Sequence, residues 1–371
     1  MEDFLYSKEL SSIKKSNRFR TRELFPEEII DLASNDYLGL STNKQIFQNA
    51  YETVLKENYH APKASMLVNG YNKIHKMFED KLCEVNNFEA AITVGSGFLA
   101  NISLIEALCR KNDTLFIDEE YHASGILATK LLKPEQVIVF NHNDALDLKN
   151  KLISNKRTGR NIIAIEGVYS MGGDLAPIEL FHLADEYKAI LIVDEAHSSG
   201  VIGDNLLGIF DYYKITPNKY HIKMGTLGKA YGSYGAYILA SKEIIDFLTN
   251  RAKPIIYSTA PSLFDIALGY ESLKHILENK KELKEKIKEN LNIIYSELGI
   301  KSQSLIIPIL IKDNKKVKEI QEILKQNGFL VGAIRQPTVK EAIIRLIAKI
   351  DINSDILRNV CRLLKDLSVN K

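Results

Sequence analysis

Apolar residues in the middle of the chain form short, nearly continuous runs separated by longer segments with helical spacing. The runs predict seven strands, at 90–94, 114–118, 136–140, 161–168, 189–196, 221–225 and 236–240. The intervening segments predict helices at 98–111, near 122–132, at 144–154 and at 178–187. Strands that lack polar alternation are typical of a parallel sheet with helices on both faces. The pattern therefore predicts a large α/β domain built on a mostly parallel sheet.

The pattern differs on either side of this region. The first segment is predicted to hold an amphipathic helix at 3–16, a basic stretch at 14–22 and a short strand at 29–32. Helices are predicted next, at 43–57 and 73–86. A long charged helix begins near residue 263, and shorter strands and helices follow it, at 304–313, 317–328, 330–337, 342–350 and 353–368. We therefore predict three parts, namely an N-terminal arm (1–42), a large domain (43–260) and a smaller C-terminal α/β domain (261–371).

Composition and charge narrow the class of protein. The formal net charge is +2 and the basic residues are scattered, which is not the pattern of a nucleic-acid-binding surface. The first residues do not resemble a signal peptide, and no apolar run is long enough to span a membrane. Cys83, Cys109 and Cys361 are far apart, which predicts neither a disulfide framework nor a zinc site. We expect a cytoplasmic protein without metal, nucleic-acid or membrane partners.

Polar residues gather in five of the turns that follow predicted strands. These turns are GSGF (95–98), DEEYHASG (118–125), EGVYSMGGDLAP (166–177), VDEAHSSG (193–200) and GTLGKAYGSYGA (225–236). The carboxyl ends of parallel strands share one edge of a sheet, and ligands of open α/β sheets bind there. The turns are therefore expected to meet at one site.

The residue types in these turns suit one cofactor. Lys229 lies among glycines, which allow a backbone to turn tightly and to approach a ligand closely. Asp194 ends a strongly apolar strand, where a carboxylate is costly unless it has a partner. Pyridoxal phosphate requires a lysine for a Schiff base, a phosphate cradle and an acidic partner for its pyridine nitrogen. Lys229 supplies the amine, Gly97 and Thr226 the cradle, and Asp194 the carboxylate.

Each turn also has an ordinary structural explanation. The glycine-rich stretch around Lys229 alone describes a surface turn, and GSG alone a tight turn. A lone histidine such as His122 is more often structural than functional. Ser170 can cap a turn as well as contact a ligand. The argument for a site therefore rests on their combination.

The sequence DEAH at 194–197 is also a motif of helicases and ATPases. Those proteins hold phosphates on a GxxxxGK[ST] loop. In this chain Ala230 follows Lys229, residue 223 is lysine where the first glycine is needed, and the segment comes after DEAH rather than before it. A nucleotide hydrolase remains a remote alternative.

The motifs together resemble the α-oxoamine synthases, a family of fold-type I pyridoxal-phosphate enzymes. They are NDYLGLS (35–41), GSGFLAN (95–101), DEEYHASG (118–125), EGVYSMGGDLAPI (166–178), VDEAHSSGVIG (193–203), GTLGKAYGSYGA (225–236) and GAIRQPTV (332–339). The resemblance runs from about residue 15 to near the end of the chain. It implies an aspartate-aminotransferase-like fold and a homodimer that completes its active sites across the subunit interface.

The resemblance also implies a role for the residues at the predicted sheet edge. Lys229 would form the Schiff base and then act as the general base on the α-carbon of the substrate. Asp194 would pair with the pyridinium nitrogen and His197 with the ring hydroxyl. His122 would stack on the ring, next to the substrate, and Ser170 would contact the ring.

Other residues would hold the phosphate of the cofactor. Gly97, Phe98 and Thr226 are expected around it, and Ser258 or Thr259 is expected to reach the phosphate in the partner subunit. A further group would bind substrate carboxylate or acyl groups, namely Asn35, Arg335, Thr338 and an arginine of the N-terminal arm, for which Arg20 is preferred to Arg18.

Within the family, the chain most resembles members that condense L-alanine with a pimeloyl thioester, on coenzyme A or an acyl carrier protein, with loss of CO2. AIRQPTV (333–339) favours this pair over glycine with acetyl-CoA or succinyl-CoA and over serine with a fatty acyl-CoA. The loop APKASMLVNG (61–70) departs from the glycine-rich stretch with an arginine that is common in the family. A catalytically silent cofactor-binding subunit is a further alternative.

Overall fold

A seven-stranded sheet forms the centre of the larger part of the molecule. The computed structural model describes residues 5–16 and 18–369. In spatial order the strands are β2 (Ala90–Val94), β8 (Ala236–Ala240), β7 (His221–Thr226), β6 (Ile190–Asp194), β5 (Asn161–Glu166), β3 (Thr114–Asp118) and β4 (Val137–Phe140). All run parallel except β8, which is antiparallel to both of its neighbours. The predicted mostly parallel sheet is confirmed.

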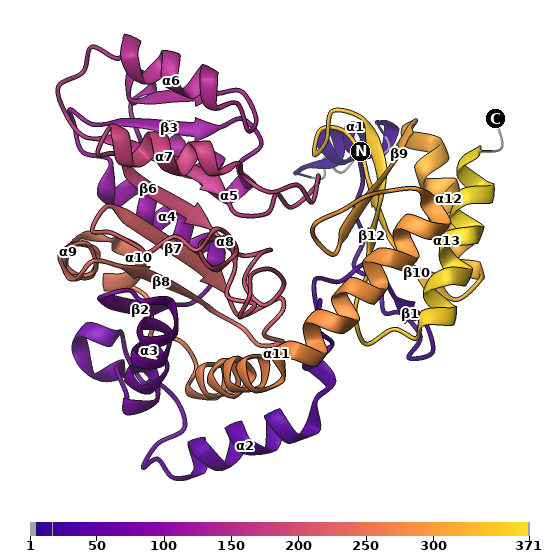
Figure 1. Cartoon of the computed structure of the whole chain (residues 1–371), viewed down its shortest axis with the longest axis horizontal. Coiled ribbons are helices and arrows are strands. Elements are labelled where there is room, and N and C mark those ends of the chain that lie inside the picture. The colour runs from indigo at the N-terminus through magenta and orange to yellow at the C-terminus, as the bar shows by residue number, and fades with distance from the viewer. Residues whose placement is uncertain (1–4, 17, 370–371) are drawn as a thin grey trace.

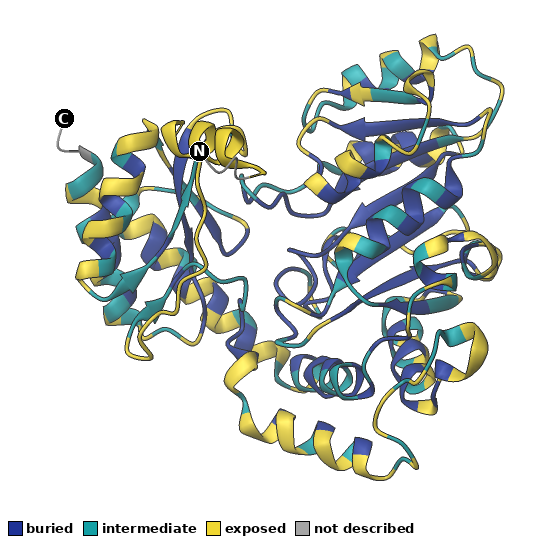
Figure 2. Cartoon of the chain, turned by 180° about the vertical axis from the view of Figure 1, so that it is seen from behind, coloured by how far each residue is buried: buried dark blue, intermediate teal, exposed yellow. Residues whose placement is uncertain are grey.

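Helices cover both faces of this sheet (Figure 1). They include α4 (Gly97–Leu108), α5 (Ala123–Thr129), α6 (Ala145–Ser154), α7 (Ile178–Glu186) and α9 (Lys242–Arg251). Successive residues of a strand point to opposite faces, so in β5 Ile163 belongs to one buried apolar cluster and Ile162 to the other. Because both faces of the sheet are buried, the strands have continuous apolar sequences. Figure 2 shows the strands buried beneath helices whose outer surfaces are exposed.

A smaller antiparallel sheet lies beside the large one. Its order is β11 (Gly332–Ile334), β12 (Ala342–Ile347) and β9 (Ile306–Lys312). The helices α12 (Asn314–Gln326) and α13 (Ser354–Val369) accompany it. The long helix α11 (Leu263–Leu298) extends from beside the large sheet to the small one (Figure 1). The predicted long helix and smaller sheet are therefore present.

The N-terminal segment joins the C-terminal part of the chain. β1 (Ile30–Asp31) pairs in parallel with β10 (Phe329–Leu330), which is separate from β11. The single strand predicted at 330–337 is therefore two short strands and a loop. The helix predicted at 3–16 is α1 (Ser7–Lys15), which has no buried residue, and the start of the predicted range lies outside the described residues.

The remaining helices lie before β2 or beside the large sheet. They are α2 (Lys44–Leu55), the π-helical turn η2 (Met66–Gly70), α3 (Lys73–Asn86), α8 (Ile209–Tyr213), α10 (Lys253–Ile256) and the short 3-10 turns η1 (Leu40–Thr42) and η3 (Pro134–Gln136). Among the described residues, no helix is both long enough and apolar enough to cross a membrane.

Candidate active site

Acidic and basic groups meet at the carboxyl edge of the large sheet. Asp118, Glu166 and Asp194 are the last residues of β3, β5 and β6, and all three are buried. Lys229 follows β7, and its Nζ lies 2.7 Å from Nε2 of His197. The tertiary structure thus places the lysine, histidine and aspartate of two separate motifs at one edge.

Local backbone geometry holds Lys229 in place. The backbone N–H of Leu227 donates to Gly235 and that of Ser233 donates back to Leu227, so the segment forms a closed turn. Gly232 has φ +56° and packs against the backbone at Leu40–Ser41. The turn is therefore pressed against the N-terminal segment. Desolvation lowers the pKa of the Lys229 amine to about 8, which brings its free-base form within reach of neutral pH.

Asp194 has a defined orientation. Its Oδ2 accepts a hydrogen bond of 2.9 Å from Nδ2 of Asn101, and its Oδ1 accepts one of 3.0 Å from the backbone N–H of Ala196. Tyr121 in turn donates from its hydroxyl to Oδ1 of Asn101 at 2.7 Å, which orients the amide. Asn101 was in a motif singled out from the sequence but carried no assigned role, because its partner lies 93 residues away.

Two histidines lie at the same edge. His197 is 5% exposed, and its Nδ1 lies 2.5 Å from the hydroxyl of Tyr37. Burial, followed by the neighbouring charge of Lys229, holds the pKa of His197 well below its usual value, so the ring is neutral. His122 caps α5 through Ser124, and burial lowers its pKa too, although the charge of Asp194 opposes the shift.

The start of α4 provides a site suited to a phosphate. Gly97 is the first residue of this twelve-residue helix, and Ser96 caps it by accepting from the N–H of Leu99. A Cβ atom added at Gly97 would lie 3.7 Å from Cβ of Thr226, so the two predicted cradle residues are adjacent. Helix N-termini attract anions through free N–H groups and the helix dipole. Phe98 is 45% exposed beside them.

Arg345 is a functional candidate that the sequence analysis missed. It lies on β12 and is only 6% exposed, yet its Nε donates to the carbonyl of Ser170 at 2.7 Å. Its Nη2 donates to Oδ1 of Asn35 at 3.0 Å. An arginine in the apolar run AIIRLIAKI carries the same signal as Asp194, a charge on a buried strand, and could have been found that way.

Glu166 is the second candidate that the sequence analysis missed. It pairs in register with Asp194, is 1% exposed, and its Oε2 accepts from the N–H of Ser170. Its Oε1 has no hydrogen-bond partner among the described residues. Burial and then the charge of Asp194 raise the pKa of this carboxyl well above its usual value. A buried polar atom without a partner marks space for a ligand group at this edge.

The remaining predicted residues lie farther from this cluster. Arg335 and Thr338 are in the loop between β11 and β12, where the N–H of Thr338 donates to the carbonyl of Arg335. Ser258 and Thr259 follow α10, next to Tyr257, which is 81% exposed. Arg20 is exposed in the N-terminal segment, as is Arg18, whose Nε donates to Oγ of Ser16. Among the described residues, these two hydrogen bonds join Arg18 to Ser16 and the backbone of Thr338 to that of Arg335, and neither involves Lys229.

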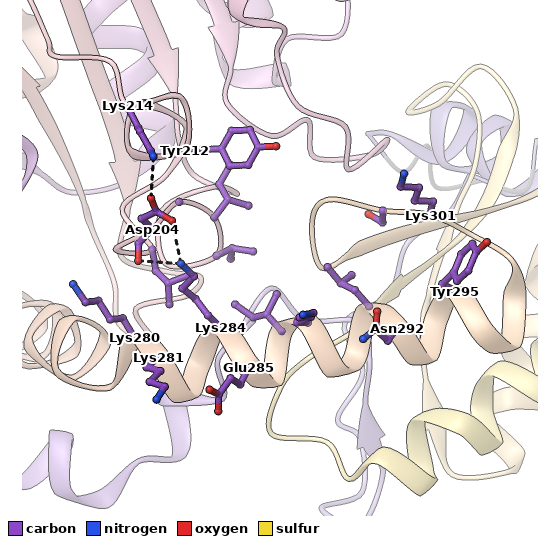
Figure 3. A pocket seen from close by; sticks show the side chains of 18 residues that line it. Asp204, Tyr212, Lys214, Lys280, Lys281, Lys284, Glu285, Asn292, Tyr295 and Lys301 are labelled. Atoms are coloured by element: carbon purple, nitrogen blue, oxygen red, sulfur yellow. Dashed lines mark hydrogen bonds and ion pairs between the residues drawn. The ribbon is translucent and has the colours of Figure 1, made fainter.

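A cavity of about 1130 Å³ lies elsewhere, between α11 and the loop that follows His197 (Figure 3). Lysines line much of it, and Asp204 contacts both Lys214 and Lys284 across it. Neither Lys229 nor Asp194 lines this cavity. The chemistry at the sheet edge is thus separate from the cavity.

The donor set at the sheet edge fits pyridoxal phosphate. A desolvated amine, a carboxyl group held by Asn101 and a helix N-terminus next to Thr226 match the aldehyde, pyridinium and phosphate of that cofactor. The unpartnered carboxyl oxygen of Glu166 is consistent with a ligand that fills the space beside Asp194.

Comparison with known proteins gives the same picture. Residues 27–363 match the family model described as aminotransferase class I and II. The chain is 47% identical over 343 residues to an 8-amino-7-oxononanoate synthase of Helicobacter pylori, with 92% of each chain covered. It is 34% identical over 329 residues to the enzyme of the same name from Petrotoga mobilis, with 86% of this chain and 83% of the relative covered.

Solved structures share the fold. The serine palmitoyltransferase of Sphingomonas wittichii superposes with a TM-score of 0.88 at 22% identity over 98% of both chains. A crystal structure of 8-amino-7-oxononanoate synthase from Francisella tularensis superposes with a TM-score of 0.74 at 26% identity, over 92% of this chain and 98% of that one. These likenesses confirm the fold-type I architecture expected from the motifs.

Proposed function

The chain belongs to the aminotransferase class I and II family and, within it, to the 8-amino-7-oxononanoate synthases, and on this premise we propose that it condenses L-alanine with a pimeloyl thioester. A bond forms between the α-carbon of alanine and the acyl carbonyl carbon, and the thiol leaves. The carboxylate of alanine is lost as CO2, and 8-amino-7-oxononanoate is the product. The protein is an acyltransferase of biotin biosynthesis. The observation that carries this conclusion is the 47% identity over 92% of the chain. The cluster of Lys229, Asp194 and His197 at the sheet edge supports it.

Pyridoxal phosphate, when bound at this site, supplies the electron sink for the charge that develops at the α-carbon. Lys229 would anchor the cofactor through its amine. Once the amine of alanine has displaced it there, the lowered pKa of the freed Nζ would let it accept the α-proton near neutral pH. Asp194 holds the pyridine nitrogen protonated, because Asn101 and Ala196 keep its carboxylate oriented toward the site. Neutral His197 hydrogen-bonds the ring hydroxyl, with Tyr37 on its other nitrogen.

The walls of the site position the rest of the cofactor. Gly97, Phe98 and Thr226 would hold the phosphate at the start of α4. His122, in the turn after β3, would stack on the ring, and Ser170, in the turn after β5, would contact it. These roles are supported by the meeting of all five turns at one edge of the sheet.

The carboxylate of alanine has two candidate anchors. Arg345 is buried and permanently charged, and it lies next to Asn35, whose role in substrate binding was predicted. We extend that prediction and assign the α-carboxylate to this pair, because a fork of guanidinium donors suits a carboxylate. Arg335, Thr338 and Arg20 then serve the acyl substrate as it enters.

A homodimer would place Ser258 and Thr259 at the partner's phosphate. Exposed apolar side chains support such an interface, since monomers rarely expose large apolar patches. They lie on η2, on α4, on and just after α5, and after α10, and are Leu67, Val68, Phe98, Leu127, Leu131 and Tyr257. These elements form a continuous series in space, because η2 contacts α10, α10 contacts α4, and α4 contacts α5. The exposed residues therefore lie on one contiguous group of elements.

The cytoplasm is the proposed compartment. All three cysteines, Cys83, Cys109 and Cys361, carry free thiols, and burial raises the pKa of each. Buried protonated thiols are stable in a reducing environment and need no disulfide partner.

Release of free thiol tests the proposed reaction. The purified protein is supplied with pimeloyl-CoA or pimeloyl-acyl carrier protein, each combined with alanine, glycine or serine. We expect alanine with a pimeloyl thioester to be the best pair and Lys229→Ala to lower turnover by roughly 10²–10⁴-fold, as expected for loss of a general base. If glycine with acetyl-CoA were far better, the substrate assignment would be wrong. Borohydride reduction followed by peptide mapping checks that Lys229 carries the cofactor.

A further inference from the structure

His142 occupies an unusual electrostatic position in the loop between β4 and α6. Its Nδ1 lies 3.0 Å from Oδ1 of Asp118, and its Nε2 lies 2.8 Å from Oδ2 of Asp174. Ionised carboxylates only accept hydrogen bonds, and a neutral imidazole has a single N–H to donate. Only the imidazolium satisfies both carboxylates, so the geometry indicates a charged ring.

The surroundings stabilise that charge. Burial lowers the pKa of His142, but the hydrogen bonds to Asp118 and Asp174 outweigh this effect and raise the pKa to about 10. Glu120 lies 3.9 Å from Nε2, and Glu119 is ion-paired with Lys340 at 3.1 Å. The rings of Tyr169 and His142 pack nearly at a right angle, with their centroids 4.3 Å apart. Asn143 donates from its backbone to Asp118 and from its amide to Asp174.

The two carboxylates belong to two different turns of the candidate active site. Asp118 ends β3 and organises the turn that leads to His122, since its Oδ1 accepts from the N–H of Glu120 and its carbonyl from that of Tyr121. Asp174 closes the hairpin 168–175, where its carbonyl accepts from the N–H of Tyr169. This hairpin carries Ser170. His142 therefore joins the turn with His122 to the turn with Ser170.

The hairpin is fixed on its other side by the smaller sheet. Ser304, just before β9, donates to the carbonyl of Gly173 at 2.6 Å, and Arg345 donates to the carbonyl of Ser170. Asp118, Glu119, Glu120 and Asp174 gather at this place, and Lys340 is ion-paired with Glu119 and Glu120. Loss of the cation at position 142 would leave Asp118 and Asp174 without the ion pairs that the imidazolium makes with them. Repulsion among those carboxylates would then push the two turns apart.

We propose that His142 is a positioning residue of this active site, an imidazolium that clamps the turns carrying His122 and Ser170 at the spacing that the cofactor needs. The expected effect of His142 on cofactor binding rests on the proposed function. The charge and the bonds of the ring are independent of that function. The residue acts through its neighbours and touches neither substrate nor cofactor.

Histidine-selective ¹⁵N NMR of the holoenzyme tests the charge directly. We expect both ring nitrogens of His142 to remain protonated at pH 8, with titration near pH 10. A neutral ring at pH 8 would overturn the proposal, whatever reaction the protein catalyses.

The positioning role is tested by the dissociation constant of pyridoxal phosphate, measured by dialysis and absorbance. His142→Gln removes the charge and one donor and should weaken binding on the order of tenfold, the worth of one charge-assisted hydrogen bond. His142→Arg keeps a charge and two donors and should restore most of the affinity. The control His182→Gln changes an exposed histidine on α7 and should have no effect.

The pH dependence separates this role from a loss of folding. Above pH 10 the dissociation constant of wild type should approach that of His142→Gln, because the imidazole loses its charge, whereas His142→Arg stays charged and should keep its advantage over His142→Gln at pH 11. If His142→Gln and wild type bind pyridoxal phosphate with equal affinity at pH 8, the positioning role of His142 is wrong, while the proposed function still stands. If wild type does not bind pyridoxal phosphate at all, the proposed function is wrong.

Discussion

At the scale of single residues, a few buried charges define the site. Lys229, Asp194 and Arg345 would each be costly inside a protein without partners, and each is surrounded by groups that stabilise or use its charge. Asp194 is recognisable in the sequence because an acidic residue ends an apolar strand. Its partner Asn101 is not recognisable, because a neutral amide on a helix carries no such signal.

Arg345→Lys should separate binding of the amino acid from binding of the thioester. Lysine keeps the charge but loses the fork that contacts Asn35 and Ser170, so we expect KM for alanine to rise by roughly ten- to a hundredfold. Steady-state kinetics with each substrate varied in turn will measure this. Arg358→Lys, at the partly buried pair with Glu297, is the matched control. A rise confined to KM for the thioester would assign Arg345 to the acyl chain instead.

At the scale of elements, the turns after the strands, rather than the strands themselves, provide most of the residues of the candidate site. The strands were predictable because burial on both faces imposes continuous apolar runs. The turn at 225–236 keeps its shape through contact with Leu40–Ser41, residues that are distant in sequence. The loop 61–70, which departs from the family pattern, contains the π-helical turn η2, and the N–H of Ala260 donates to the carbonyl of Ala64.

Gly232→Ala should disrupt this turn. A Cβ atom there would lie 2.5 Å from the backbone nitrogen of Ser41, so the N-terminal segment must move as well as the turn. Gly299→Ala also places a side chain at positive φ, but no atom lies within 4 Å of its Cβ, and it should cost only about 1–2 kcal/mol of unfolding free energy. Urea titration should show a clearly larger loss for Gly232→Ala. Equal losses for the two variants would contradict the close contact.

At the scale of the whole molecule, the candidate active site lies where several separate parts of the chain meet. Asn35 comes from the N-terminal segment, Lys229 from the large sheet and Arg345 from the small one. We propose that the chain has three parts, with boundaries after residues 42 and 260. The pairing of β1 with β10 joins the N-terminal arm to the C-terminal part. A relative shift of the two sheets would therefore change the spacing of the site.

Val68→Glu tests the homodimer. Val68 is 75% exposed on η2, and a charge there should oppose burial against a second copy and weaken self-association at least tenfold. We expect wild type to sediment as a dimer and Val68→Glu to shift toward monomer with loss of activity. Leu146→Glu, at a residue 69% exposed on α6, should remain dimeric. A fully active wild-type monomer would contradict the shared active site.

The sequence by itself determined the fold class and the cofactor, and it predicts the principal residues of the site. Apolar periodicity sets the strands, and strand ends with Lys229, Asp194 and His197 indicate the cofactor, because these signals are local in the chain. The tertiary structure decided which residues act together. Arg345, Glu166, Asn101 and His142 gain their partners from segments far away in sequence, and the strength of an ionic or hydrogen-bonding contact depends on distance and burial, which only the folded chain provides.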